Sequence, residues 1–183
     1  GPIARTKSYL HYPEQPGILM IDHDPNQFGQ PHTPDSLIRA LIALHPGFAE
    51  CAKIVKSSIS SGVVPQGSTP GSSSGFHLYI PVKNASDIPR FGEVLFQRLW
   101  LHRHGFIQIS GSGAMLVRSI IDNAVFSPER LDFVGPPVIL SPQLVYKPIP
   151  QHIIEGDYLD TTLCVDLSDT ERLQFESLVN AAK

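Results

Sequence analysis

The chain has 183 residues, 42% of them hydrophobic, and a formal net charge of −3. This length suits one domain with a sizeable core, or two small lobes that share one. The charge excludes a global basic field, so any nucleic-acid binding must come from a local patch. Cys51 and Cys164 have no CxxC spacing, which argues against a disulfide framework and favours a cytoplasmic protein. No segment approaches the ~20 apolar residues of a membrane span, so no membrane partner is expected.

The first half of the chain is cut into short elements by proline and glycine. Residues 18–21 form a continuous apolar run, which predicts a buried strand. Thr33 and Pro34 suit the N-cap and the first position of a helix that ends before Pro46. The next elements are expected in chain order: a short helix over 48–53, a strand with a serine-rich middle over 54–64, and a Gly/Ser-rich loop over 65–75.

The second half combines alternating strands with one long amphipathic helix. Alternation of apolar and polar residues predicts a strand over 76–82. The further elements are expected in chain order: a helix over 87–103, strands over 106–110 and 115–121, a turn or short helix over 127–130, a proline-rich surface segment over 134–152, and a terminal helix capped by Ser168 over 168–182.

Two aspartates follow the first apolar run, at positions 22 and 24. Side chains two apart on a strand point to the same face, so Asp22 and Asp24 would project together. Two such carboxylates repel unless a cation or a basic partner lies between them, and hard oxygen ligands suit Mg²⁺ or Mn²⁺. The alternative is a polar turn that Asp24 begins before Pro25. His23 would face the opposite side and be structural.

A second candidate site surrounds the start of the strand over 76–82. Ser74 and Gly75 lead into this strand, and His77 is its second residue. Backbone N–H groups in such a turn can hold phosphate oxygens, and a neighbouring histidine can donate a hydrogen bond to them. The alternative is a surface loop followed by a structural histidine.

Asp122 ends another apolar segment and could complete a metal site begun by Asp22 and Asp24. Three carboxylates are enough to hold two divalent ions that clamp a phosphoryl transfer. The alternative is that Asp122 caps a turn.

Four basic residues lie near these motifs in the order of the chain, namely Lys53, Lys56, Arg118 and Arg130. They could meet phosphates through charge-assisted hydrogen bonds. Each of them also fits a solvated surface charge.

The order of the three sites resembles the archaeo-eukaryotic primase superfamily. The stretches GILMIDHDP, GFHLYIPVKNASDIPRFGEVLFQRLWLHRHG and LVRSIIDNAVFSPERLDF are similar to primase-polymerase domains of plasmids, phages and integrated mobile elements. This resemblance covers roughly residues 5–140. It implies an α/β fold of the α+β type, in which a catalytic core over 3–150 contains an RRM-like mixed or antiparallel sheet flanked by helices. Residues 151–183 would be an extension leading to a helicase or accessory domain.

The resemblance also implies a function and a set of site residues. Asp22, Asp24 and Asp122 would be catalytic and would bind two divalent ions, Mg²⁺ or Mn²⁺. His77 would contact phosphates of an NTP or dNTP. The remaining residues assigned to nucleotide binding are Ser74, Gly75, Arg118, Arg130 and Lys56. The chain would act on single-stranded DNA in the cytoplasm of a prokaryote and make or extend primers.

Two other functions stay open. A non-catalytic RRM-like nucleic-acid-binding module would display exposed aromatic side chains for base stacking, with Phe76 and Phe106 as candidates. A metal-dependent phosphodiesterase would need further His/Asp ligand pairs, which the sequence does not offer.

Overall fold

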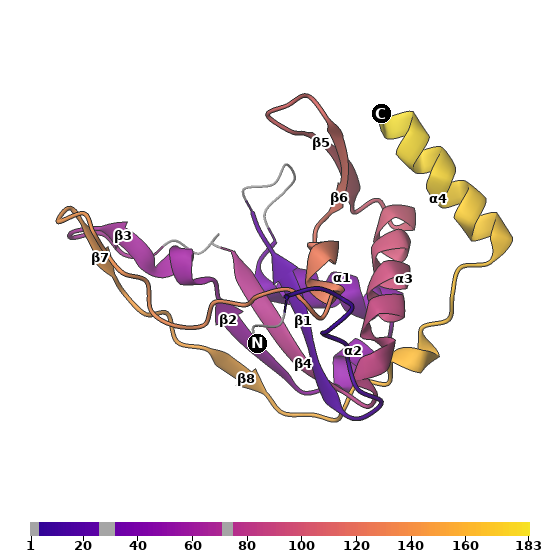
Figure 1. Ribbon diagram of the computed structural model, residues 1–183, viewed down its shortest axis with the longest axis horizontal. Helices are drawn as coiled ribbons and strands as arrows, with labels where there is room; N and C mark the ends of the chain where they lie inside the picture. The colour runs from indigo at the N-terminus through magenta and orange to yellow at the C-terminus, as the bar shows by residue number, and fades with distance from the viewer. Residues whose placement is uncertain (1–3, 26–31, 71–74) are drawn as a thin grey trace.

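The computed structural model describes residues 4–25, 32–70 and 75–183. Its centre is a four-stranded sheet in the order β1-β4-β2-β8, and every ladder in this sheet is antiparallel (Figure 1). Sheet and helices together give the expected α+β class. The four strands are β1 (Gly17–His23), β2 (Lys53–Ser57), β4 (Phe76–Val82) and β8 (His152–Ile154).

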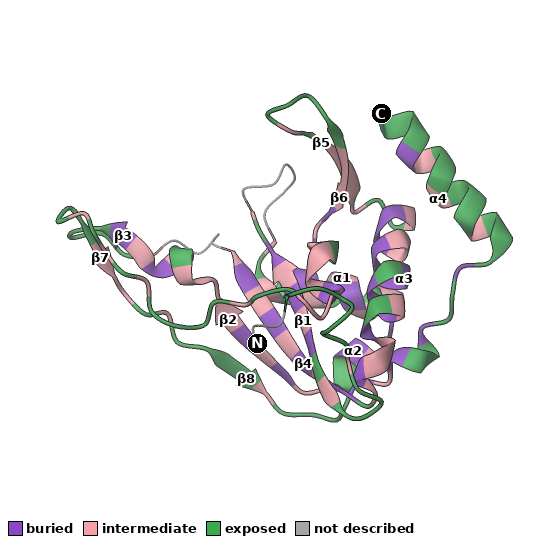
Figure 2. Cartoon of the chain, in the orientation of Figure 1, coloured by how far each residue is buried: buried purple, intermediate pink, exposed green. Residues whose placement is uncertain are grey.

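Three helices pack against one face of this sheet, and the other face carries both apolar side chains, such as Met20 and Ile54, and polar ones. The three helices are α1 (Pro34–Leu44), α2 (Gly47–Glu50) and α3 (Ile88–Leu101). Side chains alternate along β4, where Leu78 and Ile80 are fully buried and His77 and Tyr79 are not. Figure 2 shows the same alternation as buried and intermediate bands along the strands. The predicted strand 76–82 is therefore confirmed, and its apolar side faces the helices.

The helix signals in the sequence act as expected. The side chain of Thr33 accepts a hydrogen bond from the backbone N–H of Ser36, and Pro34 is the first helical residue of α1. The terminal helix is α4 (Asp169–Ala182), and Ser168 and Glu171 form a capping box at its start. No helix within the described residues is long and apolar enough to cross a bilayer.

Two further strand pairs extend from the main sheet. The hairpin of β5 (Gly105–Ile109) and β6 (Met115–Ser119) projects beside α4, and β3 (Val63–Pro65) pairs with β7 (Leu144–Tyr146) at the opposite end (Figure 1). We call residues 127–143 the crossing segment, because they run from the end of η3 (Asn123–Phe126) across the face of the sheet that the helices do not cover to β7.

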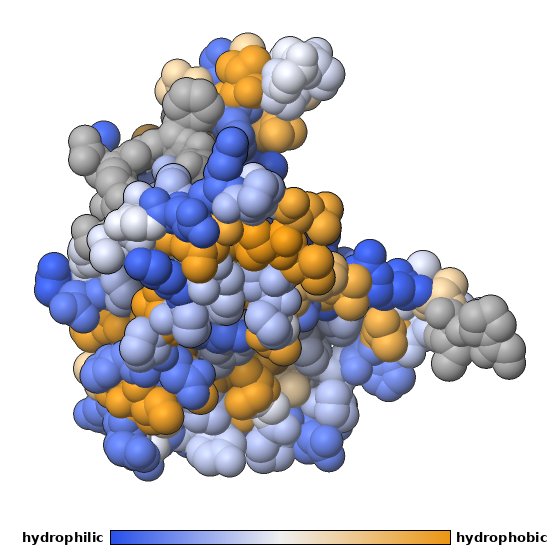
Figure 3. Space-filling view, turned by 90° about the vertical axis from the view of Figure 1, so that its left-hand side faces the viewer, coloured by the Kyte–Doolittle hydropathy of each residue, from blue (hydrophilic) through white to orange (hydrophobic). Residues whose placement is uncertain are grey.

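The outer side of the crossing segment is apolar. Val138 is 84% exposed and Leu140 is 91% exposed. Figure 3, which faces the β3–β7 side of the molecule, shows hydrophobic side chains gathered in patches among polar ones. The segment is therefore not a core element, although it lies on the sheet.

Several predicted boundaries are wrong, and the first lie around β2. The short helix expected over 48–53 ends at Glu50, and Lys53 already belongs to β2. The single strand expected over 54–64 is interrupted by η1 (Ile59–Gly62). Serine hydroxyls explain the break, since Ser58 bonds to Ser61 and Ser61 donates to the carbonyl of Gly75.

Two further predictions concern the chain after Asp122. The turn or short helix expected over 127–130 is a turn, closed by a 3.1 Å hydrogen bond from the N–H of Arg130 to the carbonyl of Ser127. The 3₁₀ turn η3 precedes it, and the side chain of Asp122 accepts a hydrogen bond from the N–H of Ala124 at its start. The proline-rich stretch 134–152 lies at the surface, as predicted, and it contains β7 and the first residue of β8.

Residues 151–183 contribute to the main body of the chain. β8 pairs with β2, and Leu159, Cys164 and Leu167 belong to the same hydrophobic core as the sheet. The boundary expected at residue 150 falls between β7 and β8.

Candidate functional site

Three of the predicted site residues lie in one row across three strands. The register pairs Asp22 of β1 with His77 of β4, and His77 with Lys56 of β2. All three side chains are on the face that the helices do not cover. The Oδ1 atom of Asp22 is 3.3 Å from the Nε2 atom of His77. Antiparallel pairing therefore brings together residues that are 55 positions apart.

Asp122 reaches the same place from a different part of the chain. Its backbone N–H donates a 2.9 Å hydrogen bond to the carbonyl of Asp22. A small pocket of about 150 Å³ is lined by Asp22, Asp24 and Asp122 together with Ser119, Ile120 and Ile121. The capping alternative also holds for Asp122, whose side chain caps η3. Asp122 thus caps a turn and lines the pocket.

The electrostatics of Asp22 reflect this crowding. Burial raises the pKa of Asp22 above its ordinary value, and the carboxylates of Asp122 and Asp24 raise it further. His77 and His23 act in the opposite direction and do not cancel the rise. A cation between these carboxylates would favour their charged forms.

The donor set fits a hard divalent cation in its chemistry, since it consists of three carboxylates. Asp22, Asp24 and Asp122 are the residues that would hold such an ion. As the side chains stand, however, no group of three or more His, Cys, Asp or Glu within the described ranges is arranged to hold a metal. Binding would therefore require the carboxylates to adjust.

His77 has a second set of partners that the sequence did not point to. Its Nδ1 atom is 3.1 Å from the Oη atom of Tyr79 and 3.5 Å from the Oδ1 atom of Asp132. Tyr79 donates a 2.5 Å hydrogen bond to the Oδ2 atom of Asp132. Tyr79 could have been found, because it shares a face with His77 two residues away. Asp132 carries no such signal, since it comes from the crossing segment.

The predicted basic residues are placed differently from one another. Lys56 donates a 3.3 Å hydrogen bond to the carbonyl of Val134 beside the row. Arg118 lies 3.9 Å from the Oδ1 atom of Asp122 and also donates to Gln108. Arg130 is exposed, and no contact recorded in the described structure joins its side chain to the pocket.

The Gly/Ser turn is described only in part. Ser74 lies outside the described residues. Gly75 accepts hydrogen bonds from the N–H of Ser58 and the hydroxyl of Ser61. A Cβ atom at Gly75 would lie 3.2 Å from the carbonyl oxygen of His23, so the turn passes close to the end of β1.

The opposite side of β1 is structural, as predicted for His23. The Nδ1–H of His23 donates a 2.7 Å hydrogen bond to the carbonyl of Ile120, and its Nε2 accepts from the N–H of His32. His23 also packs on Phe76, which is only 3% exposed. Phe76 is therefore not available for base stacking, and Phe106 is half-buried.

Comparison of the chain with protein-family models, with curated proteins and with solved structures gives no match.

Proposed function

We propose that this chain is a DNA-dependent primase-polymerase domain with the catalytic core of the archaeo-eukaryotic primase superfamily. The observation that carries the proposal is the meeting of Asp22, Asp24 and Asp122 around one pocket, with His77 in contact with Asp22. Acidic ligands and a histidine on the open face of a sheet are what nucleotidyl transfer needs, because the reaction depends on positioning and charge neutralisation.

Each residue has a role in the proposed reaction. The three aspartates would hold two divalent ions, Mg²⁺ or Mn²⁺, which supply charge neutralisation for the triphosphate and activation of the attacking 3′-hydroxyl. His77 contacts a phosphate of the incoming NTP or dNTP through its Nε2 edge. Lys56 lies in the same row and adds positive charge beside it.

Further parts of the proposal concern the surroundings of the domain. The template is single-stranded DNA, and a helicase or accessory domain would act with this domain in replication of a mobile element in a prokaryotic cytoplasm. Arg118 is the second candidate cation, since it already contacts Asp122.

Primer synthesis on single-stranded DNA tests the proposal. Wild-type protein is assayed with Mg²⁺ or Mn²⁺ and with NTPs or dNTPs, both de novo and on an annealed primer. Asp22→Ala should reduce product formation by about 100-fold or more, because loss of an ion ligand removes several kcal/mol of charge stabilisation. Asp157→Asn is the matched control, since Asp157 is exposed and does not line the pocket.

Equal activity of wild type and Asp22→Ala would contradict the proposal, as would an inert wild type with every metal and template. The alternative, a non-catalytic nucleic-acid-binding module, predicts DNA binding that is unchanged by EDTA and no primer product. The burial of Phe76 removes one of the two stacking residues on which that alternative depends.

A further inference from the structure

We propose that Tyr79 and Asp132 are positioning residues that hold the imidazole of His77 with its Nε2 atom turned toward Asp22 and the aspartate pocket. This inference rests on the proposed function, because it assigns both side chains to the site where nucleotide phosphates would bind.

The three side chains form a closed set of contacts. Tyr79 follows His77 by two residues in β4, so both project from the uncovered face of the sheet. Asp132 reaches them from the crossing segment and touches both, at 3.5 Å from the Nδ1 atom of His77 and 2.5 Å from the Oη atom of Tyr79. The Nδ1 side of the ring is therefore enclosed by two partners from different parts of the chain.

Counting protons fixes the direction of these bonds. The hydroxyl of Tyr79 has one proton, and its short contact with Asp132 uses that proton. The oxygen of Tyr79 can then only accept, so the Nδ1–H of His77 is the donor in the 3.1 Å bond between them. Burial and the hydrogen bond to Asp132 both raise the pKa of Tyr79, which keeps the hydroxyl protonated.

This arrangement leaves Nε2 as the edge of the ring that faces the pocket, where it accepts in the neutral imidazole and donates to an anion only when both ring nitrogens carry a proton. Nε2 lies 3.3 Å from the Oδ1 atom of Asp22, on the side of the pocket. A flip of the ring would break the bond to Tyr79 and move Nδ1 away from Asp132. Second partners of this kind commonly fix the orientation of a histidine that acts on a ligand, and a small misplacement is costly for transfer.

Asp132 also ties the crossing segment to the sheet. Two residues further on, the carbonyl of Val134 accepts a hydrogen bond from Lys56. Both contacts lie beside His77, because Lys56 pairs with His77 in the register. The crossing segment thus contributes the Asp132 carboxylate and the Val134 carbonyl to the surroundings of His77.

The kinetic test compares Tyr79→Phe, Asp132→Ala and Asp132→Asn. The first two should raise the nucleotide KM about 3- to 10-fold with a smaller change in kcat, which corresponds to the loss of one hydrogen bond. Asp132→Asn keeps an acceptor for the hydroxyl of Tyr79 and should restore a nearly normal KM. The double variant of Tyr79→Phe and Asp132→Ala should be no worse than either single variant, since both remove one network.

A second measurement does not depend on catalysis. The ¹⁵N resonances of the His77 ring are recorded in protein without metal or nucleotide, and both Nδ1 and Nε2 should shift in Tyr79→Phe and in Asp132→Ala. Unchanged ring resonances together with an unchanged KM would overturn the inference, as would an Asp132→Asn variant that behaves like Asp132→Ala. Tyr79→Phe removes only a hydroxyl, so it keeps the test open if Asp132→Ala does not fold.

The two proposals fail in different ways. A wild type without transferase activity, in which the His77 resonances still respond to both substitutions, would overturn the proposed function and uphold the positioning of His77.

Discussion

Asp22 combines burial with two acidic neighbours, and this combination has a cost in stability. Its pKa is raised first by burial and then by Asp122 and Asp24. A carboxyl whose pKa is higher in the folded than in the unfolded chain binds more protons when folded. Its contribution to stability therefore falls as the pH rises from the unfolded-state pKa of about 3.9 through the folded-state pKa. At neutral pH the ionised Asp22 destabilises the fold in the absence of a cation.

The first prediction follows from the destabilising effect of ionised Asp22. Asp22→Asn cannot ionise, so it should unfold at a higher temperature than wild type at neutral pH in EDTA. A gain of about 1 kcal/mol would raise the Tm by about 2–4 °C for a chain of this size. The difference should vanish below about pH 3.9, where Asp22 is protonated in both states.

Thermal unfolding followed by circular dichroism at both pH values measures the effect. Asp157→Asn is again the control, because it should leave the Tm nearly unchanged. A lower Tm for Asp22→Asn at neutral pH would show that Asp22 is stabilised by its surroundings, contrary to this argument.

At the scale of elements, one glycine sets how closely η3 approaches α3. Gly92 lies on α3 and is buried, and a Cβ atom there would come within 2.4 Å of two ring atoms of Phe126 in η3. Phe126 belongs to the same short turn that the side chain of Asp122 caps. The packing of α3 against Phe126 therefore helps to place Asp122 beside Asp22.

The second prediction is that Gly92→Ala disturbs both the core and the pocket. Overpacking of this kind typically costs about 1–3 kcal/mol, and the turn that carries Asp122 should move away from α3. Urea denaturation measures the loss of stability, and a crystal structure measures the shift of Asp122. Gly111→Ala is the matched control, since nothing lies within 4 Å of its added Cβ atom. Equal stability of the two variants would contradict the tight contact.

The elements also show what the sequence can and cannot predict. Alternation along residues 76–82 predicted both the strand and its polar side, because the period of a strand is local. The aspartates and His77 were named from their residue types and order, but their register depends on long-range pairing. Asp132 escaped prediction for the same reason, since only the path of the crossing segment brings it to Tyr79. The break within 54–64 was missed because serine hydroxyls compete locally with strand pairing.

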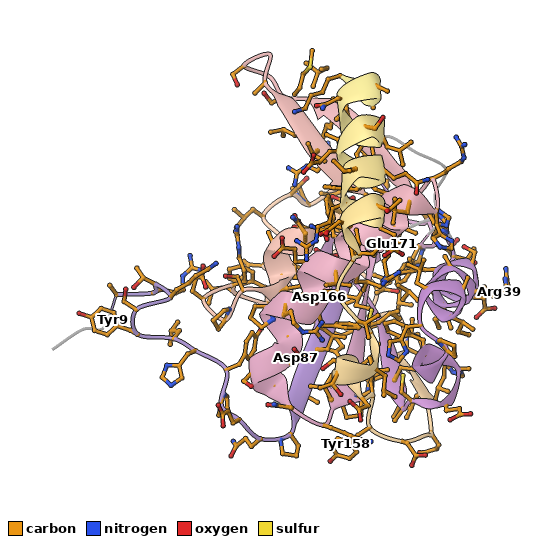
Figure 4. The ribbon with its side chains drawn as sticks, turned by 90° about the vertical axis from the view of Figure 1, so that its right-hand side faces the viewer. Tyr9, Arg39, Asp87, Tyr158, Asp166 and Glu171 are labelled. Carbon is orange, nitrogen blue, oxygen red and sulfur yellow. The ribbon has the colours of Figure 1, made fainter. Side chains whose placement is uncertain are left out.

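At the scale of the whole molecule, an arginine holds the C-terminal part of the chain on α3. Arg90 bonds to both carboxylate oxygens of Asp87, to the carboxylate of Asp166, and to the carbonyls of Thr161 and Cys164. Figure 4 shows Asp87 and Asp166 near one another on the side where this part of the chain passes α3. Arg98 adds a contact to Glu171 at the start of α4.

The third prediction is that Arg90→Gln loosens the C-terminal part without altering the pocket. The loss should be about 1–3 kcal/mol, because charged hydrogen bonds are broken and Asp87 loses its cationic partner while it keeps the hydrogen bond from Thr161. The rate of backbone amide hydrogen exchange should rise over residues 159–167, while the ¹⁵N resonances of the His77 ring stay unchanged. Lys83→Gln is the control, since its bond to Asp160 is exposed and should matter little.

The contact between Arg90 and Asp87 makes the stability of the fold depend on pH. Burial raises the pKa of Asp87, but hydrogen bonds from Arg90 and Thr161 outweigh burial and lower it overall. A carboxyl with a lowered folded-state pKa stabilises the fold above its unfolded pKa, and this contribution is lost as the pH falls through the folded value. The stability difference between wild type and Arg90→Gln should therefore be full at neutral pH and shrink below about pH 3.9. A difference that stayed constant into acid would mean that Arg90 acts through packing of its side chain rather than through Asp87.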